Sequence, residues 1–108
     1  MEAPDLLFVE CANILWKKTR LGDLREDEAV SCLDVLLTAP VRLVPSQGLL
    51  EQGLDLSLRL KHPVYDCIYL ALAVRGGLPL VTADRKFVQA VLRHKILRRH
   101  IKLLEEIH

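Results

Sequence analysis

Three acidic residues, Glu10, Asp66 and Asp84, stand in short stretches that are otherwise strongly apolar: LLFVECANILW, PVYDCIYLALA and PLVTADRKF. A charged carboxylate is costly to bury and is normally solvated, paired with a cation or bound to a metal ion. If the fold brings these three side chains together, they form a carboxylate site for a divalent metal ion. Such a site suits metal-assisted hydrolysis of phosphodiester bonds.

Each acid also has a simpler interpretation. Glu10 and Asn13 lie three residues apart on one stripe of an expected helix, which either lines a cleft or is its solvated face. Asp66 stands in the first turn of another helix, where the helix dipole stabilises an acid. Asp84 is suited to cap a following helix, and Thr82 either supports a metal-bound water or is an ordinary strand residue. The signals are weak singly and more specific together.

The elements that must position these residues follow from apolar spacing and from helix-ending residues. We expect helices at 5–20, 26–38, 46–61, 64–75 and 85–92, and strands at 41–44, 78–82 and 101–104. Ser46 is expected to cap the third helix, and Gly76-Gly77 to end the fourth. Strands separated by helices predict a parallel sheet in an α/β domain. Sites form beyond the carboxyl ends of such strands, and Asp84 directly follows the expected strand at 78–82. That strand is apolar on both faces, so we expect it to be buried on both faces.

Composition restricts the class of protein. The chain has 108 residues, of which 51% are apolar, so a single ordered domain is expected. Neither an apolar run long enough to cross a bilayer nor a cleavable leader is visible, which predicts a cytoplasmic protein. The cysteines are odd in number and form no CxxC, and the four histidines lack zinc-ligand spacing. Buried free thiols are therefore expected at Cys11, Cys32 and Cys67.

Charge is distributed unevenly along a chain whose formal net charge is only +1. Residues 85–108 hold seven of the fifteen lysines and arginines but two of the fourteen acids, and residues 85–102 hold no acid. A basic surface attracts phosphate backbones, so this segment is either a surface that binds nucleic-acid phosphates or an ordinary solvated terminal helix. In the first interpretation, the binding cations are Arg85, Lys86, Arg93, Arg98 and Arg99.

The most specific motifs are YDCIYLALA and LVTAD, within the stretches APDLLFVECANIL and HPVYDCIYLALAVRGGLPLVTADRKF. These stretches closely resemble PIN-domain ribonucleases, in particular the VapC-type toxins of bacterial toxin–antitoxin pairs, from Ala3 to about Leu104. The resemblance implies a compact α/β/α domain in which four acids surround one or two Mg²⁺ or Mn²⁺ ions. By position, it implies catalytic metal ligands at Glu10, Asp66 and Asp84, with supporting roles for Asn13 and Thr82.

One part of the family pattern has no counterpart in this sequence. The family begins with a strand that ends in an aspartate, a principal metal ligand, whereas this chain starts directly at the helix of Glu10. Glu2 and Asp5 are expected at a helix start without a preceding strand, so neither replaces that aspartate. The expectation is a single PIN-like, three-layer α/β/α domain over residues 3–108, whose short parallel sheet lacks its first, central strand. A partner chain could fill that place, the remaining strands could close up, or the domain is only marginally stable.

The resemblance implies a Mg²⁺- or Mn²⁺-dependent endoribonuclease, the toxin of a type II toxin–antitoxin system. Its partners would be an RNA substrate, a cognate antitoxin protein and a second copy of the chain in a homodimer. Loss of one of four acids would weaken metal binding and activity. The alternative is a catalytically impaired PIN domain that acts as an antitoxin-binding or dimerisation module.

Overall fold

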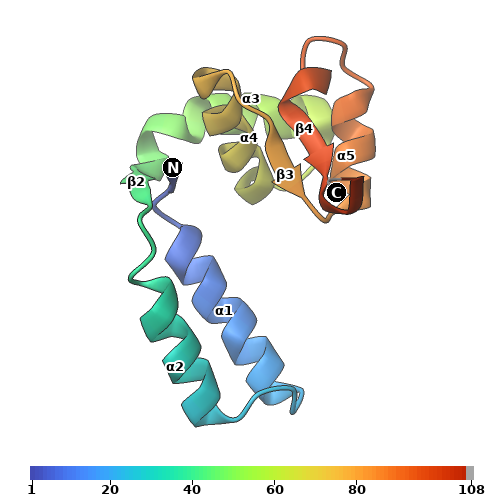
Figure 1. Cartoon of the computed structure of the whole chain (residues 1–108). Helices are drawn as coiled ribbons and strands as arrows, with labels where there is room; N and C mark the ends of the chain where they lie inside the picture. The colour runs from blue at the N-terminus through green and yellow to red at the C-terminus, as the bar shows by residue number, and fades with distance from the viewer. Residues whose placement is uncertain (107–108) are drawn as a thin grey trace. The chain divides into compact units, whose positions relative to one another are not determined.

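The structure, a computed structural model, describes residues 1–106 and divides into two compact units, Met1–Val44 and Pro45–His108. Each unit has its own helices and its own two-stranded parallel sheet (Figure 1). The sequence predicts a single domain over residues 3–108. Its last two residues, 107 and 108, lie outside the described part of the chain. The α/β class with parallel strands is confirmed, and the strands are distributed over two short sheets.

The first unit is a helical hairpin whose ends are joined by a pair of short strands. Its elements, in chain order, are β1 (Glu2–Pro4), α1 (Leu7–Arg20), α2 (Glu26–Leu36) and β2 (Arg42–Val44). The strands pair in parallel, and the backbone N–H of Asp5 extends the pairing by donating to the carbonyl of Val44 at 2.8 Å. Helices α1 and α2 lie side by side (Figure 1). Gly22 turns the chain between them with a φ of +83°.

Both predicted helices of this unit are confirmed to within two residues at either end. The expectation that no strand precedes Asp5 is wrong, because β1 ends directly before it. Three residues are too few for a periodic pattern, and this strand exists through its parallel pairing with β2. Ala3 and Pro4 of the strand are buried. Local spacing in the sequence carries no sign of that pairing.

The second unit packs three α-helices with a two-stranded sheet. Its helices are α3 (Leu50–Leu60), α4 (Val64–Gly76) and α5 (Arg85–Leu92), and its strands are β3 (Leu80–Thr82) and β4 (Ile101–Leu103). Short 3₁₀ turns occupy Ser46–Leu49, Arg98–His100 and Leu104–Glu106. Strands β3 and β4 pair in parallel, with Val81 opposite Lys102. The fully buried side chains of this unit include Leu49, Cys67, Leu70, Phe87 and Val91.

Helix α4 is the central element of this unit, as its apolar sequence predicts. It contributes four buried side chains to the core, those of Cys67, Ile68, Leu70 and Ala71. Helix α3 packs closely on it at Gly53, where a β-carbon would lie 3.1 Å from Cγ1 of Ile68. Gly77 ends α4 in the left-handed conformation, with a φ of +68°, as expected for the glycine pair.

Several boundaries and burial states in the second unit differ from the sequence prediction. Ser46 begins a 3₁₀ turn instead of capping α3, which starts at Leu50, because Gly48 disfavours the α-helical conformation there. Strand β3 starts at Leu80 and is not buried on both faces, since Val81 is 45% exposed. The sheet within residues 45–106 has two strands, and the side of β3 that carries Val81 is exposed.

The cysteines are all free, as predicted, but their burial differs from the expectation. Cys67 is buried, Cys11 is half-buried and Cys32 is exposed. Helix α2, which carries Cys32, has no buried residue in the described structure, so a thiol on its apolar side is not covered. Within residues 1–106, no helix combines the length and apolar character that crossing a membrane requires.

Candidate metal centre

Asp66 is placed by the turn that joins α3 to α4. The chain reverses at Lys61, which adopts the left-handed conformation, and Pro63 then precedes the first residue of α4. Asp66 lies in the first turn of that helix, where the helix dipole favours a negative charge. Its side chain is 43% exposed. The carboxylate is therefore held at a helix end yet remains open to water.

Asp84 follows the carboxyl end of β3, where a parallel sheet is expected to present functional groups. Its Oδ1 accepts a hydrogen bond from the backbone N–H of Phe87 at 3.2 Å, so Asp84 caps α5 as the sequence suggested. Its own N–H donates to Oγ1 of Thr82 at 3.2 Å. These two bonds fix the loop and leave Oδ2 to face other groups.

His62 brings the two acids together. Its Nε2 lies 2.7 Å from Oδ2 of Asp66 and 4.0 Å from Oδ2 of Asp84. An ionised carboxylate only accepts hydrogen bonds, so Nε2 donates its proton to Asp66. The imidazole is 14% exposed and stacks on the buried ring of Phe87, with ring centroids 4.4 Å apart. His62 is thus a fixed group against which both carboxylates are arranged.

The donor atoms of His62, Asp66 and Asp84 all lie within 4.8 Å of one another, which makes them a candidate metal-binding group among the described residues. Two carboxylates that share a small space carry two negative charges and repel one another unless a cation compensates them. Oxygen donors of this kind suit Mg²⁺ or Mn²⁺, and the exposure of both acids leaves room for bound water. The donor chemistry of the cluster therefore fits a divalent ion.

Cys67 lies behind the cluster and takes no direct part in it. Its thiol donates a weak hydrogen bond to the carbonyl of His62, with 3.9 Å between Sγ and the oxygen. Burial, and secondarily the charge of Asp66, raises the pKa of Cys67 from 9.0 to about 11. The thiol is therefore protonated at neutral pH, which excludes a thiolate ligand or nucleophile at this position.

Glu10 and Asn13 belong to α1 in the first unit, where Glu10 is half-buried and Asn13 is exposed. Asp66, Asp84 and Thr82 belong to the second unit, and these three are the predicted site residues that the structure brings into one neighbourhood. The participation of Glu10 and Asn13 stays a prediction that rests on the sequence motif.

His62 is the residue that the sequence analysis missed. The histidines were considered there only for zinc-ligand spacing. The available signal was its position four residues before Asp66, a separation that places side chains close together at the start of a helix.

The predicted RNA-binding cations have different surroundings. Lys86 and Arg93 line a common pocket on α5. Arg85 forms an ion pair with Glu105, Arg98 donates to the carbonyl of Leu92 at 2.7 Å, and Arg99 donates to Nε2 of His100 at 3.3 Å. Lys86 and Arg93 thus share a pocket, whereas the other three have partners within the chain.

Comparison with known proteins identifies the family of this chain. The family model described as PIN domain matches residues 2–91. A relative named Ribonuclease VapC3, from Pyrobaculum aerophilum, is 38% identical over 87 residues, which cover 79% of this chain and 66% of that protein. The chain thus spans slightly less than two thirds of the length of this relative. Because the family match extends over most of the chain and includes all three predicted acids, this protein belongs to the PIN-domain family.

Proposed function

We propose that this chain is a Mg²⁺- or Mn²⁺-dependent endoribonuclease of the VapC type. The observation that carries the proposal is the convergence of Asp66 and Asp84 on His62, with all three donor atoms within 4.8 Å. Membership of the PIN-domain family and the similarity to a protein named as a ribonuclease support the same activity. Clustered carboxylates with open positions for water are the ligand set that metal-assisted phosphodiester hydrolysis requires.

In this proposal, Asp66 and Asp84 hold the metal ion, and Glu10 is a third ligand assigned from the sequence motif. His62 is a positioning residue, because its Nε2 donates to Oδ2 of Asp66 and fixes the direction of that carboxylate. Thr82 accepts from the N–H of Asp84 and so keeps the loop in place. A bound divalent ion would supply activation of water and compensation of phosphate charge.

The proposed partners follow from the VapC similarity. They are an RNA substrate, a cognate antitoxin protein and a second copy of the chain in a homodimer. The proposal also includes one PIN-like domain over residues 3–108 and a cytoplasmic location.

A second candidate function is a non-catalytic module that binds an antitoxin or a second copy. The observation that favours it is the exposure of apolar side chains on α1 and α2, neither of which has a buried residue in the described structure. Val9 is 72% exposed, Trp16 56% and Val35 70%. Exposed apolar side chains in such numbers on two neighbouring helices are typical of a protein–protein interface.

The first test is calorimetric titration of the whole chain with Mn²⁺. The matched variants are Asp66→Asn/Asp84→Asn and His62→Gln, with His94→Gln as the control for loss of a histidine elsewhere. We expect binding by the parent, no measurable binding by the double aspartate variant and a loss of about 10-fold or more for His62→Gln, because partners that orient a metal ligand contribute at this level. His94→Gln should bind Mn²⁺ like the parent. RNA cleavage by the parent, His62→Gln and the double aspartate variant should follow the order of their Mn²⁺ affinities.

Failure of a folded parent to bind Mn²⁺ would contradict the nuclease proposal. Sedimentation equilibrium with Val35→Asp would then test the module. Self-association by the parent that this variant loses would support it.

A further inference from the structure

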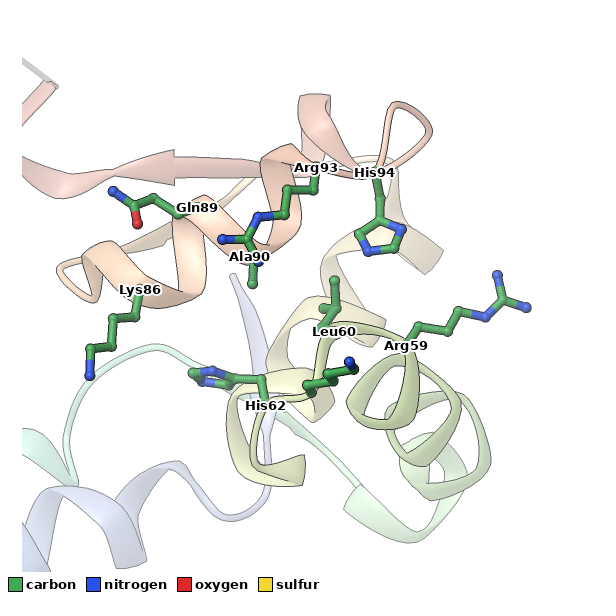
Figure 2. A pocket seen from close by; sticks show the side chains of 9 residues that line it. Arg59, Leu60, His62, Lys86, Gln89, Ala90, Arg93 and His94 are labelled. Carbon is green, nitrogen blue, oxygen red and sulfur yellow. The ribbon is translucent and has the colours of Figure 1, made fainter.

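A pocket of about 460 Å³ lies beside the acid cluster, between the carboxyl end of α3 and helix α5. Lys61 and His62 contribute from the α3–α4 turn, and Lys86 and Arg93 contribute from α5 and the residue that follows it. Figure 2 shows His62 on one side of this pocket and Lys86, Arg93 and His94 on the other. All of these residues belong to the second unit.

The charge of the pocket is one-sided. None of the described residues that line it is acidic, and Arg59 at its rim is paired with Asp55 along α3 at 3.2 Å. Among residues 1–105, whose side chains the structure describes, no ion pair joins Lys61, Lys86 or Arg93 to an acid. Like charges around one hollow repel each other and destabilise the fold, so the arrangement is favourable only when an anion is bound.

The backbone at Lys61 is a second, independent observation. This residue ends α3 with φ +54° and ψ +48°, the left-handed conformation, and it is the one non-glycine residue with positive φ in the described structure. Glycine or asparagine is the usual residue at such a helix end, because a longer side chain is strained there by roughly 1 kcal/mol. A lysine at this position places a cation at the pocket despite that cost.

His62 connects the pocket with the acid cluster. The same imidazole that lines the pocket has its Nε2 2.7 Å from Oδ2 of Asp66. We infer that this pocket is a subsite for a backbone phosphate of single-stranded RNA, held by Lys61, Lys86 and Arg93 next to the phosphodiester bond at the acids. This inference rests on the proposed nuclease function and deepens it, because it states where the neighbouring phosphate lies.

The geometry favours a nucleic acid over an acidic peptide. A strand that presents one phosphate to Asp66 and Asp84 must place its next phosphate within a short distance, and the pocket is one imidazole ring away. An arginine and two lysines on opposite walls suit a tetrahedral phosphate, which accepts hydrogen bonds from several directions. A peptide that inserts acidic side chains gains nothing from the adjacent carboxylates, which repel it.

The test measures binding of a fluorescein-labelled single-stranded RNA of about 12 nucleotides to the whole chain. Fluorescence anisotropy reports the binding, in EDTA and over a range of KCl concentrations. The variants are Lys61→Asn, Lys86→Gln and Arg93→Gln. Lys102→Gln is the matched control, because it removes one exposed cation of the same unit outside the pocket. Asparagine tolerates the left-handed conformation, so Lys61→Asn removes the charge and keeps the helix end.

We expect each pocket variant to weaken RNA binding about fivefold and to reduce the slope of log K against log salt by about 0.7, the effect of one lost phosphate contact with a single strand. Lys102→Gln should change neither quantity appreciably, and Lys61→Asn should not lower the thermal unfolding midpoint. Equal weakening by Lys102→Gln would overturn the inference in favour of a diffuse basic face. Unchanged RNA binding by the pocket variants, with weakened binding of a labelled polyglutamate peptide, would overturn it in favour of a peptide site.

Cleavage assays on the same variants separate this inference from the proposed function. If the parent binds RNA through the pocket but does not cleave it with Mn²⁺, the subsite is supported and the nuclease proposal fails. If the parent cleaves RNA and the pocket variants bind and cleave it equally well, the nuclease proposal is supported and the subsite is overturned.

Discussion

The two side-chain oxygens of Asp84 have different surroundings, and this difference bears on its role. Oδ1 accepts the N–H of Phe87 as a helix cap, while Oδ2 lies 4.0 Å from Nε2 of His62. The structural and the functional interpretation of this acid are therefore compatible, because each uses one oxygen atom. Asp66 likewise combines a stabilised position in the first turn of α4 with a carboxylate directed at His62. The helix dipole and the hydrogen bond to Phe87 offset part of the repulsion between the two carboxylates in the absence of metal.

Cys67 provides a test of the packing behind the cluster. Its folded-state pKa of about 11 lies above the ordinary value of 9.0, chiefly because the thiol is buried. Between these two values the unfolded chain releases the proton and the folded chain keeps it, so the free energy of unfolding must fall as the pH rises through this range. In EDTA, urea unfolding at pH 8 and pH 10.5 should show a loss in the parent that exceeds the loss in Cys67→Ala by on the order of 1 kcal/mol. Equal losses in the two proteins would mean that the thiol is less buried than the structure shows.

At the level of elements, the sequence predicted best those segments whose own periodicity determines them. Helix α5 occupies the predicted residues 85–92, and the end of α4 falls at the predicted glycine pair. Strand β1 was not predicted, since it depends on pairing with β2, which is far away along the chain. The helix start predicted at Ser46 is wrong, because serine is only on average a preferred helix cap. Here Gly48 disfavours the α-helical conformation, and residues 46–49 form a 3₁₀ turn.

The candidate site could be predicted only in part, for the same reason. Each acid was identified by its unusual apolar surroundings, which is a local property of the sequence. His62 was missed because its position depends on the left-handed turn at Lys61 and on stacking against Phe87. Residue spacing shows neither the turn nor the stacking. The excess of cations in the terminal segment likewise did not separate Lys86 and Arg93, which line one pocket, from the other cations there.

The packing of α3 on α4 gives a prediction at this scale. A β-carbon at Gly53 would already lie 3.1 Å from Cγ1 of Ile68 and 3.6 Å from its backbone, and Ile68 is buried. Gly53→Leu should therefore force the helices apart and lower the free energy of unfolding by about 1–3 kcal/mol in urea. Gly76→Leu is the matched control, because a β-carbon there meets no atom within 4 Å. The control should be neutral or slightly stabilising, since leucine favours a helix more than glycine does. A similar loss in both variants would show that the contact with Ile68 does not determine the effect.

At the scale of the whole molecule, the family match is more extensive than either structural unit. It runs from residue 2 to residue 91 and so includes Glu10 in the first unit as well as Asp66 and Asp84 in the second. The assignment of Glu10 as a ligand rests on the sequence motif, whereas the assignment of Asp66 and Asp84 rests also on the cluster within the second unit.

The assignment of Glu10 can be tested separately from that of the two acids in the second unit. If Glu10 is a ligand of the same ion, Glu10→Gln should weaken Mn²⁺ binding in calorimetry by about 10-fold or more while keeping the size and helix preference of the side chain. Glu26→Gln, which removes an acid from α2 in the same unit, should leave the affinity unchanged. Thermal unfolding of both variants should remain close to that of the parent.

Combining Glu10→Gln with Asp66→Asn separates a shared ion from an independent effect. Two ligands of one ion are coupled, so the double variant should lose less binding free energy than the sum of the two single losses once the site has collapsed. Strictly additive losses would indicate that Glu10 acts on metal affinity from outside the site. A Glu10→Gln variant that binds Mn²⁺ like the parent would remove Glu10 from the proposal and leave Asp66 and Asp84 as the proposed ligands, with His62 as the residue that orients Asp66.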